Sequence, residues 1–272
     1  MHKAPPMNYA RCMAFQQAPS QSCRAVLFDL DGVLTPTAQL HARAWKATFD
    51  AFMKRRATET GEPFTPFDVE ADYRAHVDGK RRADGVRAFL GSRAIRVEEG
   101  HPDDPPSADT IHGIGAHKNE SFRRELEDGG IGPYHDAMTL LGELRAAKIP
   151  CAVVSSSANA EAVLNAAGIA QLFEERVDGR TATELSLQGK PAPDTFLEAA
   201  RRLGVAPADA AVIEDATAGV QAGRAGHFGL VIGLARHGEH AELHAAGADR
   251  VLSNLDEAHE LLLVARTKES DT

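Results

Sequence analysis

Two aspartates separated by a single residue follow the first apolar run of the chain. The run, Ala25 to Phe28, is short and uninterrupted, which is typical of one buried strand, and Asp29, Asp31 and Gly32 come directly after it. The glycine indicates a turn at this point. Because ligands bind at the carboxyl ends of parallel strands, the pattern places two carboxylates at a candidate site. Taken alone, an Asp-x-Asp-Gly segment is equally typical of a strand that ends in a polar turn.

Polar side chains also follow the later apolar runs, and we expect all of them to meet at one edge of a sheet. They are Ser155, Ser156 and Ser157 after one run, Glu214 and Asp215 after another, and Lys190 between the two in a loop stiffened by prolines. Carboxylates crowded at one edge repel each other, so the cluster needs a compensating cation. Hard oxygen ligands with no His or Cys nearby favour Mg²⁺.

Two differently patterned parts of the chain must position these clusters. Residues 37–132 have helical spacing broken by glycine and proline, whereas residues 133–272 alternate short apolar runs with helical segments. Strands that alternate with helices predict a parallel sheet covered on both faces, so the fold class is α/β. The single strand before the helical block indicates a small α-helical cap domain inserted into a Rossmann-like core directly after its first strand. The core is then residues 21–36 and 133–272, the cap is residues 37–132, and residues 1–20 are a flexible extension.

The expected elements of the cap are helices over residues 40–53, 67–77, 85–90 and 118–126, the third of them capped by Asp84. In the core we expect strands over residues 25–28, 151–154, 210–213 and 230–232, and helices over residues 138–147, 158–167, 193–203, 218–225 and 257–265.

Composition and charge exclude several classes of protein. Hydrophobic residues make up 43% and charged residues 25% of the 272 residues, as in ordinary globular proteins. The formal net charge of −9 argues against a nucleic-acid partner, which would need clustered lysine and arginine. No apolar stretch is long enough to cross a bilayer. The three cysteines lack metal-ligand spacing and leave one unpaired, so we expect reduced thiols in a cytoplasmic protein. We also expect a monomer or weak homodimer whose partner is a small molecule.

The polar clusters, taken in chain order, resemble a known family. Asp29-x-Asp31-Gly32, Ser155 after an apolar strand, Lys190 in Gly-Lys-Pro and the pair Glu214-Asp215 are similar to the four motifs of the haloacid dehalogenase superfamily. The likeness extends over nearly the whole chain after residue 20. The helical insert after the first strand resembles, more narrowly, the β-phosphoglucomutase-like subfamily, which carries a small cap in the same place.

The resemblance implies a role for each motif residue. Asp29 would be the nucleophile that forms an aspartyl-phosphate, and Asp31 would be the general acid and base. Ser155 and Lys190 would bind the oxygens of the transferring phosphoryl group. The implied Mg²⁺ ligands are the Asp29 carboxylate, the Asp31 backbone carbonyl and Asp215, supported by Glu214.

The resemblance also implies residues that bind a sugar phosphate. In the cap, His41 and Trp45 match a His-x-x-x-Trp sequence of sugar-phosphate enzymes, Arg82 matches an arginine that holds a second phosphate, and Lys118 matches a lysine that reaches the same substrate. In the core, Ser157 and Asn159 match residues that bind the distal phosphate, with Ser156 beside them.

Alternatives remain open for the cap residues. The alternative interpretation is that Trp45 belongs to the hydrophobic interior of the cap, with His41 on its surface. Arg81 is close enough in register to be the true counterpart of Arg82, and a run of cations is often a solvated face.

Two departures from the mutase pattern bear on the function. Pro36 stands where mutases usually carry an aspartate, and Ala158 stands where they usually carry a cation beside the phosphate. The missing cation weakens the case for holding a bisphosphate, so we expect first a Mg²⁺-dependent phosphatase that acts on a small sugar phosphate. The first alternative is a mutase that interconverts β-glucose 1-phosphate and glucose 6-phosphate. The second is a phospho-sugar sensor without catalysis, which would have no need of a nucleophile.

Overall fold

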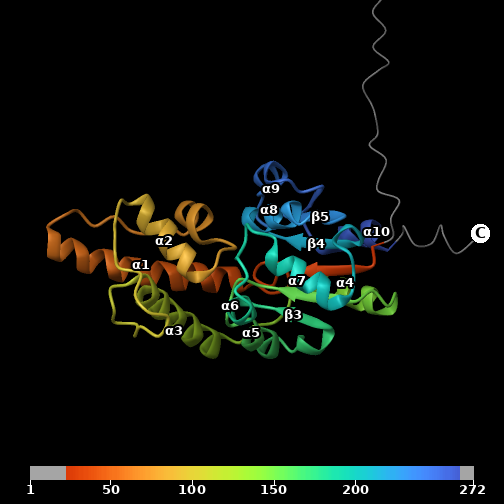
Figure 1. Cartoon of the computed structure of the whole chain (residues 1–272), viewed down its shortest axis with the longest axis horizontal. Coiled ribbons are helices and arrows are strands. Elements are labelled where there is room, and N and C mark those ends of the chain that lie inside the picture. Colours follow the sequence, from red (N-terminus) through yellow and green to blue (C-terminus); the bar gives the residue numbers. More distant parts are fainter. Residues whose placement is uncertain (1–22, 264–272) are drawn as a thin grey trace, which may run out of the picture.

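The computed structural model of the chain describes residues 23–263. The expected extension over residues 1–20 lies outside this range, as do the last two residues of the helix expected over 257–265. The described part is elongated, with long helices at one end and a sheet flanked by helices at the other (Figure 1). None of its helices is long and apolar enough to cross a membrane.

Six strands form one parallel sheet in the described residues, in the order β3-β2-β1-β4-β5-β6. The strands are β1 (Ala25–Phe28), β2 (Cys151–Val154), β3 (Glu175–Val177), β4 (Ala210–Glu214), β5 (Leu230–Leu234) and β6 (Arg250–Leu252). In the centre, Leu27 lies opposite Ala152 on one side and opposite Val212 on the other. Chain order therefore reverses at β1, and an α/β sheet binds its ligand at such a point. The predicted α/β class is confirmed.

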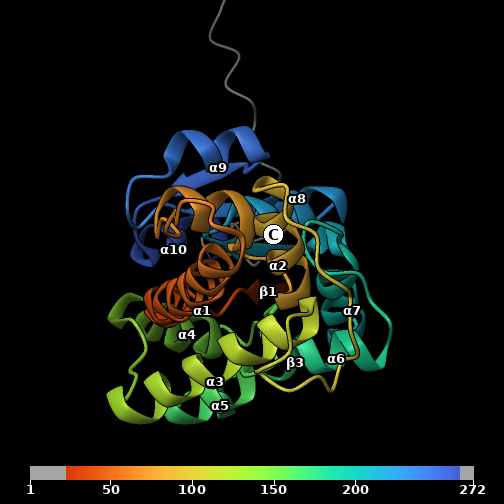
Figure 2. The same cartoon turned by 90° about the vertical axis from the view of Figure 1, so that its left-hand side faces the viewer.

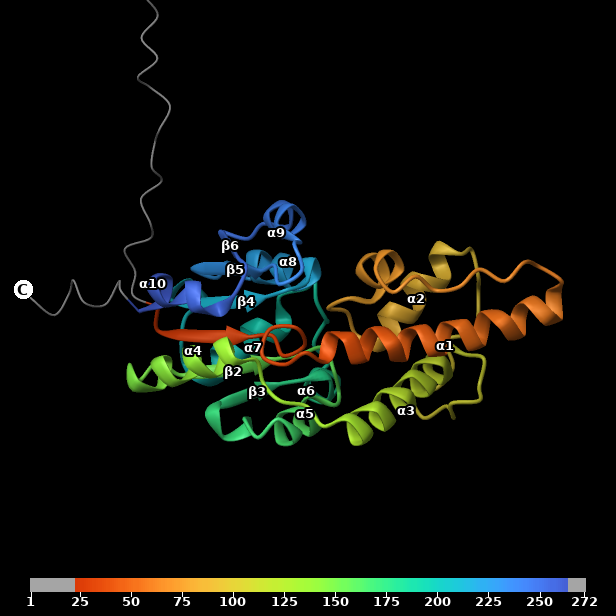
Figure 3. The same cartoon turned by 180° about the vertical axis from the view of Figure 1, so that it is seen from behind.

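Side chains alternate between the two faces of the sheet and enter two separate hydrophobic clusters. Val26 and Phe28 pack on one face, and Ala25 and Leu27 pack on the other. The first cluster is covered by α4 (His135–Ala146), α5 (Ala160–Ala166) and α10 (Ala258–Leu262), and the second by α7 (Asp194–Leu203), α8 (Thr217–Ala225) and α9 (His240–Ala246). The short helix α6 (Gly179–Glu184) follows β3, and 3-10 turns occupy Ala170–Leu172, Pro207–Asp209 and Leu255–Glu257. Seen from behind, β1 lies inside this layered body and its carboxyl end points at α1 (Figure 3).

The inserted cap has a hydrophobic interior of its own. It contains α1 (Thr37–Thr60), a π-helical turn (Tyr73–Val77), α2 (Arg82–Ser92) and α3 (Ile111–Gly129). Its interior is built around Phe49 and Phe89, whose rings lie 4.1 Å apart between centroids. Viewed from the cap end, α1, α2 and α3 stand in front of the sheet (Figure 2). The predicted insertion after the first strand is thus confirmed.

We keep the domain limits 21–36, 37–132 and 133–272 as a proposal. It is supported by the start of α1 at Thr37 and by the return of the chain to the core, where the Tyr134 N–H donates to the Leu34 carbonyl at 2.9 Å.

Several expected elements of the cap differ from the structure. The helix expected over 67–77 begins later, at residue 71, and its second part is the π-helical turn; at its start the Asp68 carboxylate accepts the N–H groups of Glu70 and Ala71, as an N-cap side chain does. Asp84 does not cap the next helix; α2 begins one turn earlier, after Arg81. The helix expected from residue 118 begins at Ile111, where the Thr110 hydroxyl caps it by accepting the Gly113 N–H.

Candidate active site

The predicted polar clusters meet at the carboxyl edge of the sheet. Asp29 follows β1, Ser155 follows β2, and Glu214 ends β4, so three neighbouring strands deliver their side chains to one place. Lys190 comes to the same place from the loop between α6 and α7. Its ammonium nitrogen lies 2.5 Å from Asp29 Oδ1, 2.6 Å from Glu214 Oε1 and 3.0 Å from the Val154 carbonyl.

Lys190 is held as a cation although only 2% of it is exposed. Burial alone would lower the pKa of Lys190, but the charges of Asp29 and Glu214 outweigh burial and raise it. One ammonium thus faces two carboxylates, and the negative charge of the cluster is only partly balanced. This geometry suits an amine that neutralises charge on a phosphoryl group beside Asp29.

Three carboxylates form a group that fits a metal ion. Oxygens of Asp29, Glu214 and Asp215 lie within 4.8 Å of one another. Burial is the main cause that raises the pKa of Asp29 and of Asp215, and neighbouring carboxylates raise both further. Carboxylate oxygens are the donors that Mg²⁺ prefers, and a divalent cation would balance the negative charge of this group. The Asp31 side chain is not part of this group; the prediction concerned its backbone carbonyl and stays a prediction.

Two glycines make room for these carboxylates. A Cβ on Gly32 would lie 1.8 Å from Asp215 Oδ2, and a Cβ on Gly219 would lie 1.7 Å from Glu214 Oε1. Gly32 also has a φ of +90°, a conformation that side chains disfavour. The glycine after the aspartate pair therefore does more than turn the chain, because it seats a carboxylate of the proposed metal site.

Asp31 points away from the acidic group and toward the cap. Its Oδ1 accepts the Thr37 hydroxyl at 2.5 Å and lies 3.4 Å from His41 Nε2, and its Oδ2 lies 3.4 Å from the Ser155 hydroxyl. Burial alone would raise the pKa of Asp31, but His41 and Thr37 outweigh it and lower the pKa to about 2. Asp31 is therefore ionised near neutral pH, ready to accept a proton from a hydroxyl group.

His41 links Asp31 to a buried cation. Its Nδ1 lies 2.6 Å from Lys118 Nζ and its Nε2 lies 3.4 Å from Asp31 Oδ1. When Lys118 is charged its ammonium can only donate, so Nδ1 then accepts and the Nε2–H faces Asp31. Lys118 is 5% exposed and lies over the Trp45 ring at 5.1 Å. Burial, followed by the charge of Arg82, lowers the pKa of Lys118 to about 7. Burial and the Lys118 charge also lower the pKa of His41.

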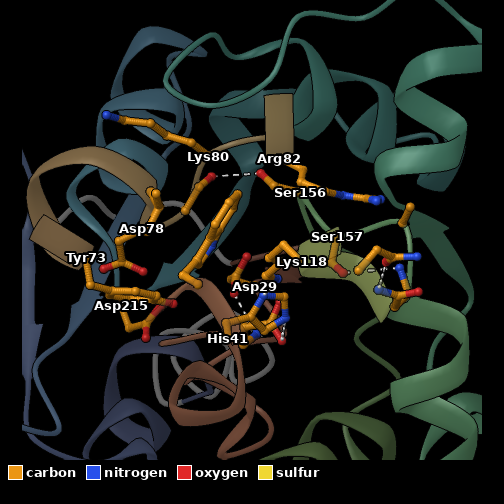
Figure 4. A pocket seen from close by; sticks show the side chains of 17 residues that line it. Asp29, His41, Tyr73, Asp78, Lys80, Arg82, Lys118, Ser156, Ser157 and Asp215 are labelled. Carbon is orange, nitrogen blue, oxygen red and sulfur yellow. Dashed lines mark hydrogen bonds and ion pairs between the residues drawn. The ribbon is translucent and has the colours of Figure 1, made fainter. Parts of the chain in front are cut away.

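The cap and the core enclose a cavity over Asp29 (Figure 4). Its volume is about 60 Å³, which holds only a few water molecules and no sugar phosphate. A ligand of that size would require the cap to move away from the core. Predicted site residues that line the cavity are Asp29, Asp31, His41, Trp45, Arg82, Lys118, Ser156, Ser157, Asn159 and Asp215; Ser155, Lys190 and Glu214 are buried outside its lining.

The two adjacent arginines have different surroundings. Arg82 lines the cavity and donates to the Gly115 carbonyl at 3.3 Å, and burial lowers its pKa. Arg81 does not line the cavity and donates instead to the Leu187 carbonyl of the core at 3.2 Å. Of the two, Arg82 is the arginine placed to meet a ligand. Trp45 belongs both to the cavity lining and to the cap interior, so these two interpretations are compatible.

Two of the core residues expected to bind substrate contact the cap directly. The Ser156 hydroxyl donates to the Gly79 carbonyl at 2.8 Å, and Asn159 Nδ2 donates to Asn119 Oδ1 at 2.8 Å. The Ser157 hydroxyl instead accepts the Asn159 N–H at 3.1 Å. These contacts close the cavity in the present structure.

Sequence reasoning missed several residues of the site, among them Thr37, Tyr73 and Asp78. Thr37 holds Asp31, while Tyr73 and Asp78 line the cavity from the cap. Burial, then the charge of Glu214, raises the pKa of Asp78 to about 7. The available signals were the position of Thr37 at the start of a helix after a proline, and an aspartate directly before Gly79 in the cap.

Comparisons with known proteins agree with this site. Residues 23–227 match the profile of the haloacid dehalogenase-like hydrolases. The chain is 51% identical over 240 residues to the β-phosphoglucomutase of Mycobacterium tuberculosis, covering 87% of this chain and 92% of that protein. It is 33% identical over 218 residues to the β-phosphoglucomutase of Bacillus subtilis, covering 77% of this chain and 83% of that one. A crystal structure of β-phosphoglucomutase from Clostridium difficile shares the fold, with a TM-score of 0.70 at 23% identity over 92% of this chain and 99% of that chain.

Proposed function

Because the chain belongs to the haloacid dehalogenase-like hydrolase family and is 51% identical to a β-phosphoglucomutase, we propose that it is a phosphoryl-transfer enzyme, a Mg²⁺-dependent β-phosphoglucomutase. It would interconvert β-glucose 1-phosphate and glucose 6-phosphate. The sequence alone ranked a sugar phosphatase first. We now place the mutase first, because two relatives, at 51% and 33% identity, are named as β-phosphoglucomutases and because of the cations in the cavity.

The observation that carries the proposal is the pair of cap cations in the same cavity as Asp29. Arg82 and Lys118 both line it, and their mutual repulsion adds to the cost of burying them. A phosphatase acting on one phosphate over Asp29 has no need of this second cationic region. An enzyme that holds a bisphosphate does need it, because a buried dianion requires fixed cations. These two cations replace in part the one that is missing at Ala158.

In this proposal, Asp29 carries the phosphoryl group between two positions of the sugar. Phosphorylated Asp29 faces the C6 hydroxyl of β-glucose 1-phosphate, and Asp31 removes the proton of this hydroxyl while the oxygen attacks phosphorus and the Asp29–phosphorus bond breaks. The product is a bisphosphate. It turns around, Asp29 attacks the C1 phosphate, and Asp31 returns the proton to the departing C1 oxygen.

The other motif residues bind and orient during both halves. Lys190 neutralises charge on the phosphoryl oxygens from its place beside Asp29. Asp29 and Asp215 would hold Mg²⁺, which offsets the repulsion between the carboxylate and the phosphate. Arg82 and Lys118 would hold whichever phosphate is not reacting. A cap closed over the bound sugar would leave little space for water, which favours transfer to the sugar over hydrolysis.

A product assay tests the proposal. Wild-type protein is incubated with Mg²⁺, β-glucose 1-phosphate and a trace of glucose 1,6-bisphosphate, and glucose 6-phosphate and inorganic phosphate are measured side by side. We expect glucose 6-phosphate to account for most of the substrate consumed. Release of one phosphate per substrate consumed, without glucose 6-phosphate, would establish the phosphatase instead.

A further inference from the structure

Arg81 extends from the cap onto a loop of the core. It lies directly before α2, and its guanidinium donates to the Leu187 carbonyl at 3.2 Å and to the Thr183 hydroxyl at 3.3 Å. Thr183 lies in α6, and Leu187 lies in the loop that carries Lys190. Arg81 lies outside the cavity lining, so binding the substrate does not account for these contacts.

The side chain of Arg81 also packs directly on Gly189. A Cβ on Gly189 would lie 2.4 Å from both Cγ and Cδ of Arg81, closer than real side chains approach, and the next nearest atom is Arg81 Cβ at 3.6 Å. The backbone of Gly189 is not in the left-handed region, so its conformation does not demand glycine. The absence of a side chain here is explained by the approach of Arg81.

The residue after Gly189 is Lys190, which contacts Asp29 and Glu214. We propose that Arg81 is a positioning residue that clasps the Thr183–Gly189 segment when the cap is closed and so fixes Lys190 against the reacting carboxylate. Cap closure and the placement of Lys190 are then one event. This inference needs only phosphoryl transfer at Asp29 and holds whether the acceptor is a sugar phosphate or water.

A second contact between cap and core serves as an internal comparison. Arg74 in the π-helical turn pairs with Glu239 at 2.9 Å, and neither residue contacts Gly189 or Lys190. Loss of this pair would loosen the cap without acting on the lysine loop. Comparing variants at Arg81 with variants at Arg74 therefore separates an effect on Lys190 from a general effect on cap closure.

A double-mutant cycle tests the clasp through kcat and KM for consumption of β-glucose 1-phosphate and for hydrolysis of p-nitrophenyl phosphate, whichever products form. Arg81→Ala and Gly189→Ala should each lower kcat by about tenfold with little change in KM. The double variant should be no slower than the slower single variant, because the methyl group added at position 189 meets no obstruction once Arg81 is shortened. Gly189→Ala combined with Arg74→Ala should show multiplied losses, of about a hundredfold if Arg74→Ala alone costs tenfold.

Two further variants and one spectroscopic signal complete the experiment. Arg81→Lys keeps methylene groups over Gly189 and one donor, so it should recover part of the loss. Arg87→Ala removes a cap arginine whose contacts, Asp84 and Glu99, lie within the cap, and it should behave as wild type. Trp45 is the single tryptophan, and its quenching by acrylamide should rise in Arg81→Ala as the cap opens.

The clasp is overturned by any of three results. Unchanged kcat in Arg81→Ala would show that Lys190 needs no support from the cap. Multiplied losses in Arg81→Ala/Gly189→Ala would show that Gly189 acts independently of Arg81. Equal coupling of Gly189 to Arg74 and to Arg81 would show only a general dependence on closure. Absence of glucose 6-phosphate among the products would refute the mutase and leave this test intact.

Discussion

Lys190 Nζ and Asp29 Oδ1 lie 2.5 Å apart, although the two residues are 161 positions apart in the chain. The contact joins the loop after α6 to the end of β1. Because Lys190 also contacts Glu214 at 2.6 Å, one buried ammonium balances two buried carboxylates. The same lysine is thus a part of the fold and a part of the site.

Lys190→Met should lower both stability and activity. Removing one partner of a buried ion pair leaves uncompensated charge and costs about 3–5 kcal/mol. Burial already raises the folded-state pKa of Asp29, and loss of the lysine charge raises it further, so the deficit is largest near neutral pH and shrinks as pH falls. Urea unfolding at pH 7 and pH 5 measures the difference in free energy of unfolding between the variant and the wild type. Arg145→Met, which removes an exposed cation on α4, is the control, and equal free energies for Lys190→Met and this control would refute the argument.

Removal of the metal should abolish turnover. The raised pKa values of Asp29 and Asp215 indicate that their charges need a cation. We expect activity to vanish after chelation and to return with Mg²⁺. Asp215→Asn, which changes a direct ligand, should raise the Mg²⁺ concentration for half-maximal rate by at least about tenfold, because loss of even an outer-shell partner costs that much. A Mg²⁺ titration of the rate gives this number. Full activity after exhaustive chelation would rule out the metal site.

The pH dependence of kcat/KM should report Lys118. Burial and the Arg82 charge lower its pKa to about 7 in the free enzyme. The cation is present below this pH and is lost above it, so kcat/KM for a sugar phosphate should fall as pH rises through about 7. Lys118→Met should abolish this fall of kcat/KM with pH, and it should lower kcat/KM below pH 7. Lys118→Arg should shift the fall to a much higher pH, since arginine stays charged. If kcat/KM of Lys118→Met still falls near pH 7 as in the wild type, the titrating group is not Lys118.

Arg82→Ala should discriminate between substrates. For a substrate that presents a second phosphate we expect a loss of about 2–4 kcal/mol of transition-state binding. Hydrolysis of a simple aryl phosphate, which presents no second phosphate to the cap, should barely change. Equal losses on both substrates would mean that Arg82 acts structurally, and no loss on either would remove the main support for the mutase.

The sequence was sufficient for the central strands and for the residues that follow them. β1, β2 and β4 are uninterrupted apolar runs, and the expected bounds of β2 agree with the structure. The edge strands β3 and β6 were missed, because each is short and carries charged residues, such as Glu175 and Arg250, at its exposed margin. Ile111 was not expected to begin a helix, because glycines at 113 and 115 resemble a loop.

The core motif residues of the site were predictable, because each follows a strand or lies in a recognisable loop. Residues whose position depends on contacts between cap and core were harder to predict. A lysine in a proline-stiffened loop was expected near Asp29, whereas the sequence could not choose between Arg81 and Arg82. Adjacent residues separate there because the chain enters α2, so one side chain faces the core loop and the next faces the cavity. Asp78 was missed because its place in the cavity depends on how the cap closes.

The most direct test of the mutase follows the phosphoryl group itself. Wild-type protein is labelled on Asp29 with ³²P, freed of excess donor and mixed with β-glucose 1-phosphate, and the label is separated into sugar phosphates and inorganic phosphate; Asp29→Asn, which should take up no label, is the control. The mutase predicts that most of the label appears in glucose bisphosphate and glucose 6-phosphate. Label found only in inorganic phosphate, at a rate that β-glucose 1-phosphate does not change, would contradict it.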